Sequence, residues 1–177
     1  MVADRRSTLR VGATDVRASA VAIHGIEMVR AECAPGSIIA AFSSFGNEPP
    51  TDLLVSGLVD MGYRVILPRV INATEMTWHH YDGTWTTDTL GISTPATNDE
   101  VSMTNCALIF IPAVAASPDG RRLGRGGGYY DRMLEKLPTH AEGGPFRCAV
   151  IDAPGLLANG VIPMDSHDAW VDGILVG

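Results

Sequence analysis

Short, continuously apolar runs that alternate with helix-like segments constrain the fold of this chain more than any other feature of its sequence. A strand buried on both faces has the form of such a run, whereas a surface helix shows apolar residues every three or four positions. The alternation predicts a three-layer α/β sandwich with a mostly parallel central sheet. We expect strands at residues 37–43, 64–68, 107–112, 146–151 and 171–176, and helices at residues 16–32, 52–61 (capped by Thr51 and ended by Gly62) and 129–137.

Residues 70–102 depart from this alternation. Trp78, Tyr81 and Trp85 are interleaved there with Thr, Gly and Asp, a texture that predicts short antiparallel strands or a structured loop. The two tryptophans could stack on a flat ligand or pack in the core or a lid. The sequence contains no internal repeat and no linker, and 177 residues suit one domain, so we expect residues 1–177 to form a single domain.

Composition excludes several classes of function. A net charge of −7 argues against sequence-independent binding of DNA or RNA, which needs an excess of Lys and Arg. No apolar run approaches the roughly 18 residues of a membrane span, and the N-terminus has no signal-peptide pattern, so we expect a cytoplasmic protein. Cys33, Cys106 and Cys148 form no C-x-x-C pair, which excludes zinc knuckles and thioredoxin-type motifs and favours buried free thiols.

A glycine-rich segment at residues 119–131, Asp-Gly-Arg-Arg-Leu-Gly-Arg-Gly-Gly-Gly-Tyr-Tyr-Asp, lies between a predicted strand and a predicted helix. Glycines let the backbone approach phosphate oxygens and adopt positive φ, so that successive N–H groups point into one anion-binding nest. The helix that follows adds the positive end of its dipole. Arg122 and Arg125 supply charge, and Asp131 suits the metal that accompanies a nucleotide. The segment therefore predicts a nucleotide phosphate site.

Two familiar phosphate motifs do not fit this segment. A Walker A loop requires a Gly-Lys pair, which the chain lacks, and the dinucleotide fingerprint begins at Gly124 but meets Tyr129 at its third glycine position. Glycine richness alone leaves a flexible surface loop with solvated arginines as an alternative. His79 and His80 do not form a metal pair, because adjacent residues of a strand point to opposite faces.

The string at residues 122–131, Arg-Leu-Gly-x-Gly-x-Gly-Tyr-Tyr-Asp, resembles the signature of the 5-formyltetrahydrofolate cyclo-ligase family. The resemblance covers nearly the whole chain. Residues 6–10 (Arg-Ser-Thr-Leu-Arg) look like the family's K-x-x-L-R, and residues 45–51 (Phe-Gly-Asn-Glu-Pro-Pro-Thr) are similar to its E-x-x-T element. Residues 62–68 match its G-x-x-V-x-x-P strand, and residues 163–168 match its P-x-x-x-x-D element.

The resemblance implies an α/β fold and an enzyme that acts on small molecules: it converts 5-formyltetrahydrofolate to 5,10-methenyltetrahydrofolate while splitting ATP, with Mg²⁺ as cofactor. We expect the protein to be a monomer. Arg125 and Tyr129 would be catalytic, and Asp131 and Asp168 would hold the metal. The implied ATP-binding residues are Arg6, Arg10, Arg122, Leu123, Gly124, Arg125, Gly126, Gly127, Gly128, Tyr129 and Tyr130. The implied folate-binding residues are Arg10, Ser43, Glu48, Arg125, Gly126, Gly127, Gly128 and Tyr129.

The chain also departs from the family pattern. Arg6 replaces the usual Lys, Ala116 and Ser117 stand where Phe-Asp is common, and residues 93–95 lack a frequent Glu. These differences support an alternative, a catalytically weakened member that binds folate or nucleotide without efficient turnover. A third possibility, an α/β enzyme for a sugar phosphate, leaves Glu48 and the two metal-binding carboxylates without a task.

Overall fold

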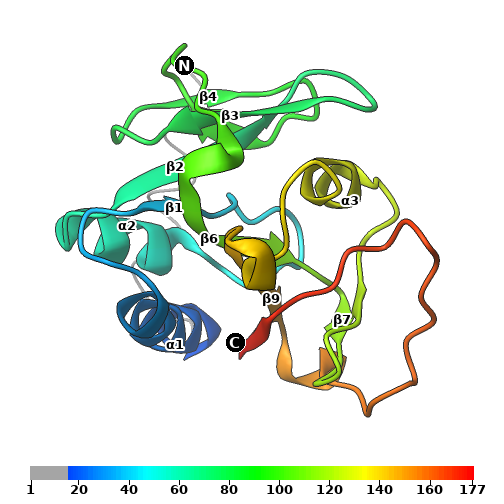
Figure 1. Cartoon of the computed structure of the whole chain (residues 1–177). Coiled ribbons are helices and arrows are strands. Elements are labelled where there is room, and N and C mark those ends of the chain that lie inside the picture. The colour runs from blue at the N-terminus through cyan, green and yellow to red at the C-terminus, as the bar shows by residue number, and fades with distance from the viewer. Residues whose placement is uncertain (1–15) are drawn as a thin grey trace.

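A six-stranded sheet forms the centre of the molecule in the computed structural model, which describes residues 16–177 (Figure 1). Its strand order is β10-β9-β6-β1-β2-β3. Neighbouring strands are parallel except at one edge, where β3 runs antiparallel to β2. The strands are β1 (Ile38–Ala40), β2 (Arg64–Val70), β3 (Met76–His80), β6 (Cys106–Pro112), β9 (Phe146–Ile151) and β10 (Gly173–Val176).

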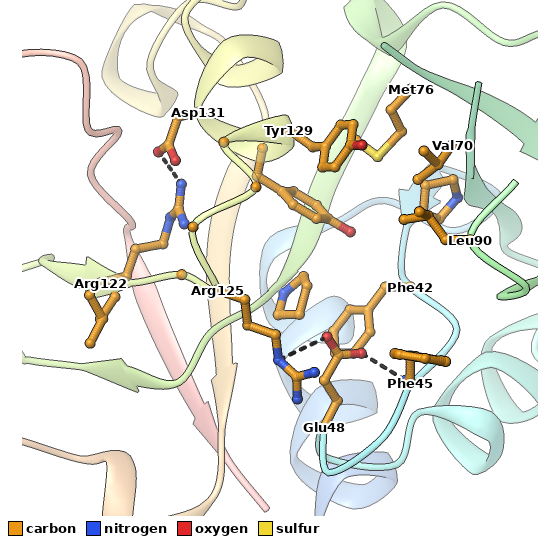
Figure 2. A pocket seen from close by; sticks show the side chains of 18 of the residues that line it. Phe42, Phe45, Glu48, Val70, Met76, Leu90, Arg122, Arg125, Tyr129 and Asp131 are labelled. Atoms are coloured by element: carbon orange, nitrogen blue, oxygen red, sulfur yellow. Dashed lines mark hydrogen bonds and ion pairs between the residues drawn. The ribbon is translucent and has the colours of Figure 1, made fainter. Parts of the chain in front are cut away.

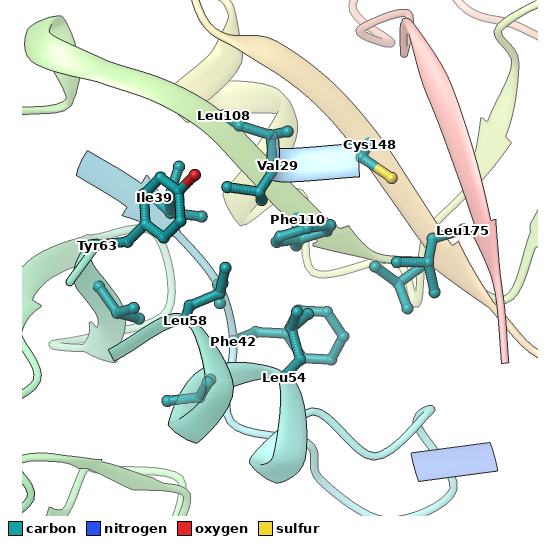
Figure 3. Close-up of a cluster of buried hydrophobic side chains, with 14 of the residues drawn as sticks. Val29, Ile39, Phe42, Leu54, Leu58, Tyr63, Leu108, Phe110, Cys148 and Leu175 are labelled. Atoms are coloured by element: carbon teal, nitrogen blue, oxygen red, sulfur yellow. The ribbon is translucent and has the colours of Figure 1, made fainter. Parts of the chain in front are cut away.

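Helices cover both faces of this sheet. α1 (Val16–Glu32) and α2 (Asp52–Asp60) lie on one face, and the shorter α3 (Tyr129–Leu134) lies on the other (Figure 1). Alternate residues of β6 serve the two faces: Phe110 packs with α1 and α2 in one buried cluster (Figure 3), whereas Ile109 belongs to the cluster beneath α3. This arrangement confirms the predicted α/β sandwich with a mostly parallel sheet.

Two glycines let α1 and α2 pack closely. A Cβ on Gly25 would lie 2.7 Å from Cδ1 of Leu54, and a Cβ on Gly57 would lie 2.8 Å from Cδ1 of Ile26. Gly25, which interrupts the apolar pattern of the first helix, therefore has a packing role. Thr51 stands at the N-cap position of α2, but its side chain does not cap the helix as we predicted; its hydroxyl donates to the carbonyl of Phe42.

Residues 70–102 form both of the structures predicted for them, short antiparallel strands and structured loops. β3 joins the central sheet, and β4 (Trp85–Thr87) pairs with β5 (Ser93–Pro95) in a separate hairpin. Trp78 is buried and packs edge-on against Tyr130, while Trp85 packs on Tyr81, so both tryptophans serve packing.

Several element boundaries differ from those predicted. The predicted strand at residues 37–43 is reduced to β1, and β10 begins two residues later than expected. The segment between the strand predicted at 107–112 and the helix predicted at 129–137 contains β8 (Arg122–Leu123), which pairs with β7 (Ala115–Ala116). The helix predicted at 129–137 ends at Leu134; residues 135–137 continue in turns, and the buried Arg147 binds the carbonyls of Leu134, Leu137 and Pro138 there.

Single 3-10 turns complete the chain: η1 (Met103–Asn105), η2 (His140–Glu142) and η3 (Ala153–Gly155). Within residues 16–177, no helix has the length and apolar character needed to cross a membrane.

The strand order reverses beside β1: the chain proceeds from β1 to β2 on one side, and from β6 to β9 and β10 on the other. Ligands of open α/β sheets bind at the carboxyl ends of the strands at such a point.

Candidate active site at the carboxyl ends of β1 and β6

A pocket of about 780 Å³ opens at this reversal point (Figure 2). Its walls come from segments far apart in sequence, including the loop that follows β1, the strands β2 and β3, the β4–β5 loop, the glycine-rich loop and residues 163–168. The lining residues are Phe42, Ser43, Phe45, Glu48, Pro68, Val70, Met76, Asp88, Leu90, Ile92, Pro112, Arg122, Leu123, Gly124, Arg125, Gly126, Gly127, Gly128, Tyr129, Tyr130, Asp131, Pro163, Asp165 and Asp168. Every site residue predicted within residues 16–177 lines this pocket; Arg6 and Arg10 lie outside the described residues.

The glycine-rich loop forms one wall and leads directly into α3. Gly126 and Gly128 have φ of 87° and 65°, and Gly128 is the N-cap residue of α3. An L side chain is strained in this left-handed region, so these turns require glycine. Positive φ at alternate positions can turn successive N–H groups toward one side, as the predicted anion-binding nest requires.

Arg122 and Asp131 are joined by an ion pair at the base of this loop (Figure 2). The side chain of Arg122 is only 4% exposed, whereas that of Asp131 is 27% exposed. The oxygen of Asp131 that contacts Arg122, Oδ1, also accepts a hydrogen bond from the Ala169 N–H at 3.2 Å. Asp131 therefore connects the glycine-rich loop to the C-terminal segment of the pocket.

Asp131 and Asp168 both face the pocket as carboxylates, the ligand type that Mg²⁺ prefers. Oδ2 of Asp168 accepts the N–H of Asp165 at 2.8 Å, which holds the side chain in a tight turn. Within residues 16–177, no three acidic, His or Cys side chains are grouped to hold a metal by themselves. Mg²⁺ at nucleotide sites commonly uses one or two carboxylates together with phosphate oxygens and water, so this pair fits a nucleotide-borne ion.

Glu48 lies across the pocket from the loop, in the segment after β1 (Figure 2). Its Oε2 accepts the Phe45 N–H at 2.8 Å, and its Oε1 lies 3.5 Å from Nε of Arg125. Burial raises the pKa of Glu48, while the Phe45 N–H and the Arg125 guanidinium oppose that rise. The Glu48–Arg125 contact joins the two sides of the pocket.

The wall between these polar ends is apolar (Figure 2). Val70 and Met76 are cross-strand partners in β2 and β3, and Leu90 comes from the β4–β5 loop. The Asp88 carboxylate holds that loop against the end of β2 through the Val70 N–H, and it also accepts the N–H groups of Leu90 and Ile92. Sequence reasoning missed this wall, although Val70 follows the predicted strand at residues 64–68 on the same sheet edge.

The two tyrosines after the loop have different surroundings. The Tyr129 hydroxyl donates to the carbonyl of Asn72 at 2.9 Å, so it reaches the turn between β2 and β3. Tyr130 packs against Trp78, and burial, aided by the charge of Glu48, raises the pKa of its hydroxyl well above the ordinary range. Tyr130 is therefore a neutral wall of the pocket.

Comparison with known proteins gives a consistent answer. Residues 1–177 match the 5-formyltetrahydrofolate cyclo-ligase family model. Proteins named 5-formyltetrahydrofolate cyclo-ligase from Mus musculus and Mycolicibacterium smegmatis are 28% and 30% identical to this chain over 147 and 148 residues. Those alignments cover 77% and 79% of this chain, and 71% and 73% of the respective relatives.

Solved structures agree at the level of the fold. A 5,10-methenyltetrahydrofolate synthetase from Mycoplasma pneumoniae matches 95% of this chain and 92% of its own, with a TM-score of 0.65 and 21% identity. The corresponding synthetase from Aquifex aeolicus matches 91% of this chain and 78% of its own, with a TM-score of 0.73 and 20% identity. Since the family match extends over the full length of the sequence, this chain belongs to the 5-formyltetrahydrofolate cyclo-ligase family, a family of ligases.

Proposed function

We propose that this protein catalyses the ATP- and Mg²⁺-dependent cyclisation of 5-formyltetrahydrofolate to 5,10-methenyltetrahydrofolate, with release of ADP and phosphate. Family membership supports the reaction class. The observation that carries the proposal is the pocket itself, which has a glycine-rich loop and two carboxylates on one side and Glu48 on the other. A reaction between a nucleotide and a folate needs both kinds of recognition in one cavity.

The nucleotide would bind at the glycine-rich loop. Its phosphates need N–H donors and positive charge, which residues 124–128, the N-terminus of α3 and Arg125 offer. Asp131 and Asp168 would hold Mg²⁺, which when bound neutralises phosphate charge. Without the metal, the two carboxylates would repel the polyphosphate.

The folate would bind with its pterin toward Glu48. The pyrimidine edge of a pterin presents adjacent N–H donors, and a carboxylate is their natural acceptor. Phe42, Phe45 and Leu90 offer the apolar contact that a flat ring needs, and Ser43 adds a polar group beside them. Arg125, which contacts Glu48 in the structure described here, would move to the nucleotide phosphates when the pterin takes its place.

The proposed chemistry has two steps. The oxygen of the N5-formyl group first attacks the γ-phosphorus of ATP, so that an O–P bond forms and the bond to ADP breaks. The formyl carbon, a poor electrophile before this step, is thereby activated. N10 then attacks the activated carbon, the C–N10 bond forms, N10 loses its proton to solvent, and the C–O bond breaks to release phosphate. Catalysis of such a reaction rests on positioning and charge neutralisation rather than on a protein nucleophile.

Arg125 and Tyr129 are the proposed catalytic residues. Arg125 would stabilise the charge that develops on the transferred phosphoryl group, as cationic side chains do in phosphoryl transfer. Tyr129 would lie against the phosphates and the folate at the N-terminus of α3. Arg6 and Arg10, which lie outside the described residues, would add further charge.

Within the described residues, the departures from the family pattern lie away from the pocket. Ala116 and Ser117 are fully buried, and the Ser117 hydroxyl donates to Asp119 within a turn. β5, where the frequent Glu is missing, does not line the pocket. The described positions therefore give no support to the catalytically weakened alternative. We propose further that residues 1–177 act as one domain and as a monomer in the cytoplasm.

A direct assay tests the proposal. Pure protein is incubated with ATP, Mg²⁺ and 5-formyltetrahydrofolate, and the methenyl product is followed by its absorbance together with ADP. Product that depends on all three components supports the cyclo-ligase reaction. A single-turnover reaction with excess protein separates slow catalysis from none: binding of both ligands without product would establish the weakened alternative instead.

A further inference from the structure

Arg132 lies just behind the glycine-rich loop and does not line the pocket. Its guanidinium donates from Nη2 to the carbonyl of Gly127 at 2.9 Å and from Nε to the carbonyl of Thr74 at 3.2 Å. The same group lies over the ring of Tyr129, with Cζ 5.1 Å from the ring centroid. One side chain thus connects the loop, the start of α3 and the turn between β2 and β3.

The contact with Gly127 controls a pocket N–H group. Because a trans peptide is planar, its carbonyl and N–H point in opposite directions, so holding the Gly127 carbonyl also fixes the N–H of Gly128. Both glycines line the pocket, whereas Arg132 binds the carbonyl of their shared peptide. The geometry around Gly128 is also adapted to Arg132: a Cβ there would lie 2.6 Å from Nη1 of the arginine.

The turn at residues 71–75 supplies a firm anchor. The Asn72 side chain accepts the N–H and hydroxyl of Thr74 at 3.0 and 3.1 Å and donates to Glu75 at 3.0 Å. The Tyr129 hydroxyl binds the carbonyl of Asn72 in the same turn. The loop is therefore tied to the sheet edge at two places, through Tyr129 and through Arg132.

We propose that Arg132 is a positioning residue for the nucleotide site: by binding the carbonyls of Gly127 and Thr74 together, it holds the glycine-rich loop in its phosphate-binding conformation before ATP arrives. The inference rests on the proposed ATP site. The planar guanidinium matters as much as its charge, since the ammonium of a lysine is a point donor and cannot present two donors in the same fork. Preorganisation of this kind improves affinity by removing an ordering cost.

The test compares Arg132→Gln, Arg132→Lys and a matched control, Lys136→Gln, which removes one positive charge from an exposed position just beyond α3. ATP binding with Mg²⁺ is measured by calorimetry, and amide exchange in residues 124–128 is measured without ligand. We expect both Arg132 variants to weaken ATP binding about tenfold, the usual effect of losing a charge-assisted hydrogen bond. Lys136→Gln should change ATP binding less than about twofold, as an exposed charge does.

The amide exchange separates positioning from a direct contact with phosphate. A positioning role requires faster exchange at residues 124–128 in both Arg132 variants, with the central strands unchanged. Wild-type exchange in the loop, or full ATP affinity in Arg132→Lys, would overturn the inference. If wild-type protein fails to bind ATP, the proposed function falls, and the exchange comparison still decides whether Arg132 orders the loop.

Discussion

Glu48 is held in place by its own loop rather than by a neighbouring helix or strand. The Ser44 hydroxyl donates to the carbonyl of Pro49, and the N–H of Thr51 donates to Ser44, so the loop closes on itself at both sides of Glu48. The Phe45 N–H then fixes one carboxylate oxygen. A carboxylate that is constrained in this way can meet a ligand without losing side-chain entropy.

Glu48→Gln tests the folate end of the pocket. The amide would face the pterin donors with a donor of its own, and losing one charged hydrogen bond costs about 1.5–3 kcal/mol, roughly a ten- to hundredfold loss of affinity. We expect the Michaelis constant for 5-formyltetrahydrofolate to rise by that factor while ATP titrations stay unchanged. Glu135→Gln, at the exposed C-cap position of α3, is the control. Normal folate affinity in Glu48→Gln would place the pterin elsewhere.

The raised pKa of Glu48 predicts a pH dependence. Pterin binding needs the ionised carboxylate of Glu48, so the affinity for folate should fall as the pH drops through the pKa that Glu48 has in the folded protein. Because burial raises that pKa above its ordinary value of 4.5, the fall should begin at a higher pH than for an exposed glutamate. Folate affinity measured from pH 8 downward in wild type and Glu48→Gln checks this; parallel curves would show that another group titrates.

Asp131 and Asp168 should respond differently to substitution. We expect Asn at either position to raise the Mg²⁺ concentration needed for activity, because each loses a charged metal ligand. Asp131→Asn should also lower the thermal midpoint, because it leaves the buried Arg122 without its ion-pair partner. Asp60→Asn, at the exposed end of α2, is the control. Wild-type Mg²⁺ dependence in either variant would remove that residue from the metal site.

Sequence reasoning identified most polar residues of the pocket, but it missed Asp88, Asp165 and the apolar wall. The string at residues 122–131 resembles a family signature, and this resemblance can be seen without any structure. Val70, Met76 and Leu90 are ordinary apolar residues, and only the β2–β3 pairing and the Asp88 contacts bring them to the cavity. Arg132 was missed for a similar reason, because its role depends on backbone carbonyls 58 and five positions away.

At the scale of elements, the apolar periodicity of the sequence predicted those helices and strands whose apolar residues pack in the core. α1, β6 and β9 are long enough, or apolar enough, for their pattern to be unambiguous. The end of α3 could not be found from its pattern, because residues 135–137 continue in tighter turns whose carbonyls bind Arg147, which is distant in sequence. The pairing of β4 with β5 likewise depends on the Asp88 turn rather than on any apolar alternation.

Gly128→Ala tests the junction between the loop and α3. A left-handed alanine costs roughly 1–2 kcal/mol of stability, and the new Cβ would displace the Arg132 guanidinium. Gly36→Ala is a matched control, since Gly36 has φ of 77° and nothing within 4 Å of an added Cβ. Both variants should lose similar stability in urea titrations, but only Gly128→Ala should lose ATP affinity. Equal ATP affinity in the two variants would contradict a phosphate-binding loop.

At the scale of the whole molecule, the pocket lies where the strand order reverses, at the carboxyl ends of β1 and β6. Parallel strands joined by helices follow from the sequence pattern and from the right-handed rule for such connections. The order of the strands in the sheet does not follow from the sequence pattern, because strands with similar apolar runs could occupy one another's positions in the sheet. The agreement between this fold and those of the two solved synthetases therefore adds information that periodicity lacks.

The three cysteines are all free and buried; Cys33 and Cys148 belong to the cluster beneath α1 and α2, and Cys106 belongs to the cluster on the other face of the sheet. Burial raises the pKa of Cys33 to about 11 and that of Cys106 to about 12, and it raises the pKa of Cys148 as well. Since the thiolate is the reactive form, a thiol reagent must wait until the protein opens. Cys33, at 8% exposure after the end of α1, should be labelled first, and Cys148, fully covered in β9, only on global unfolding. Mass spectrometry of cysteine labelling over time, with and without ATP and Mg²⁺, would therefore record how far ligand binding stabilises the surroundings of each cysteine. Equal labelling rates at Cys33 and Cys148 would mean that the core opens as one unit.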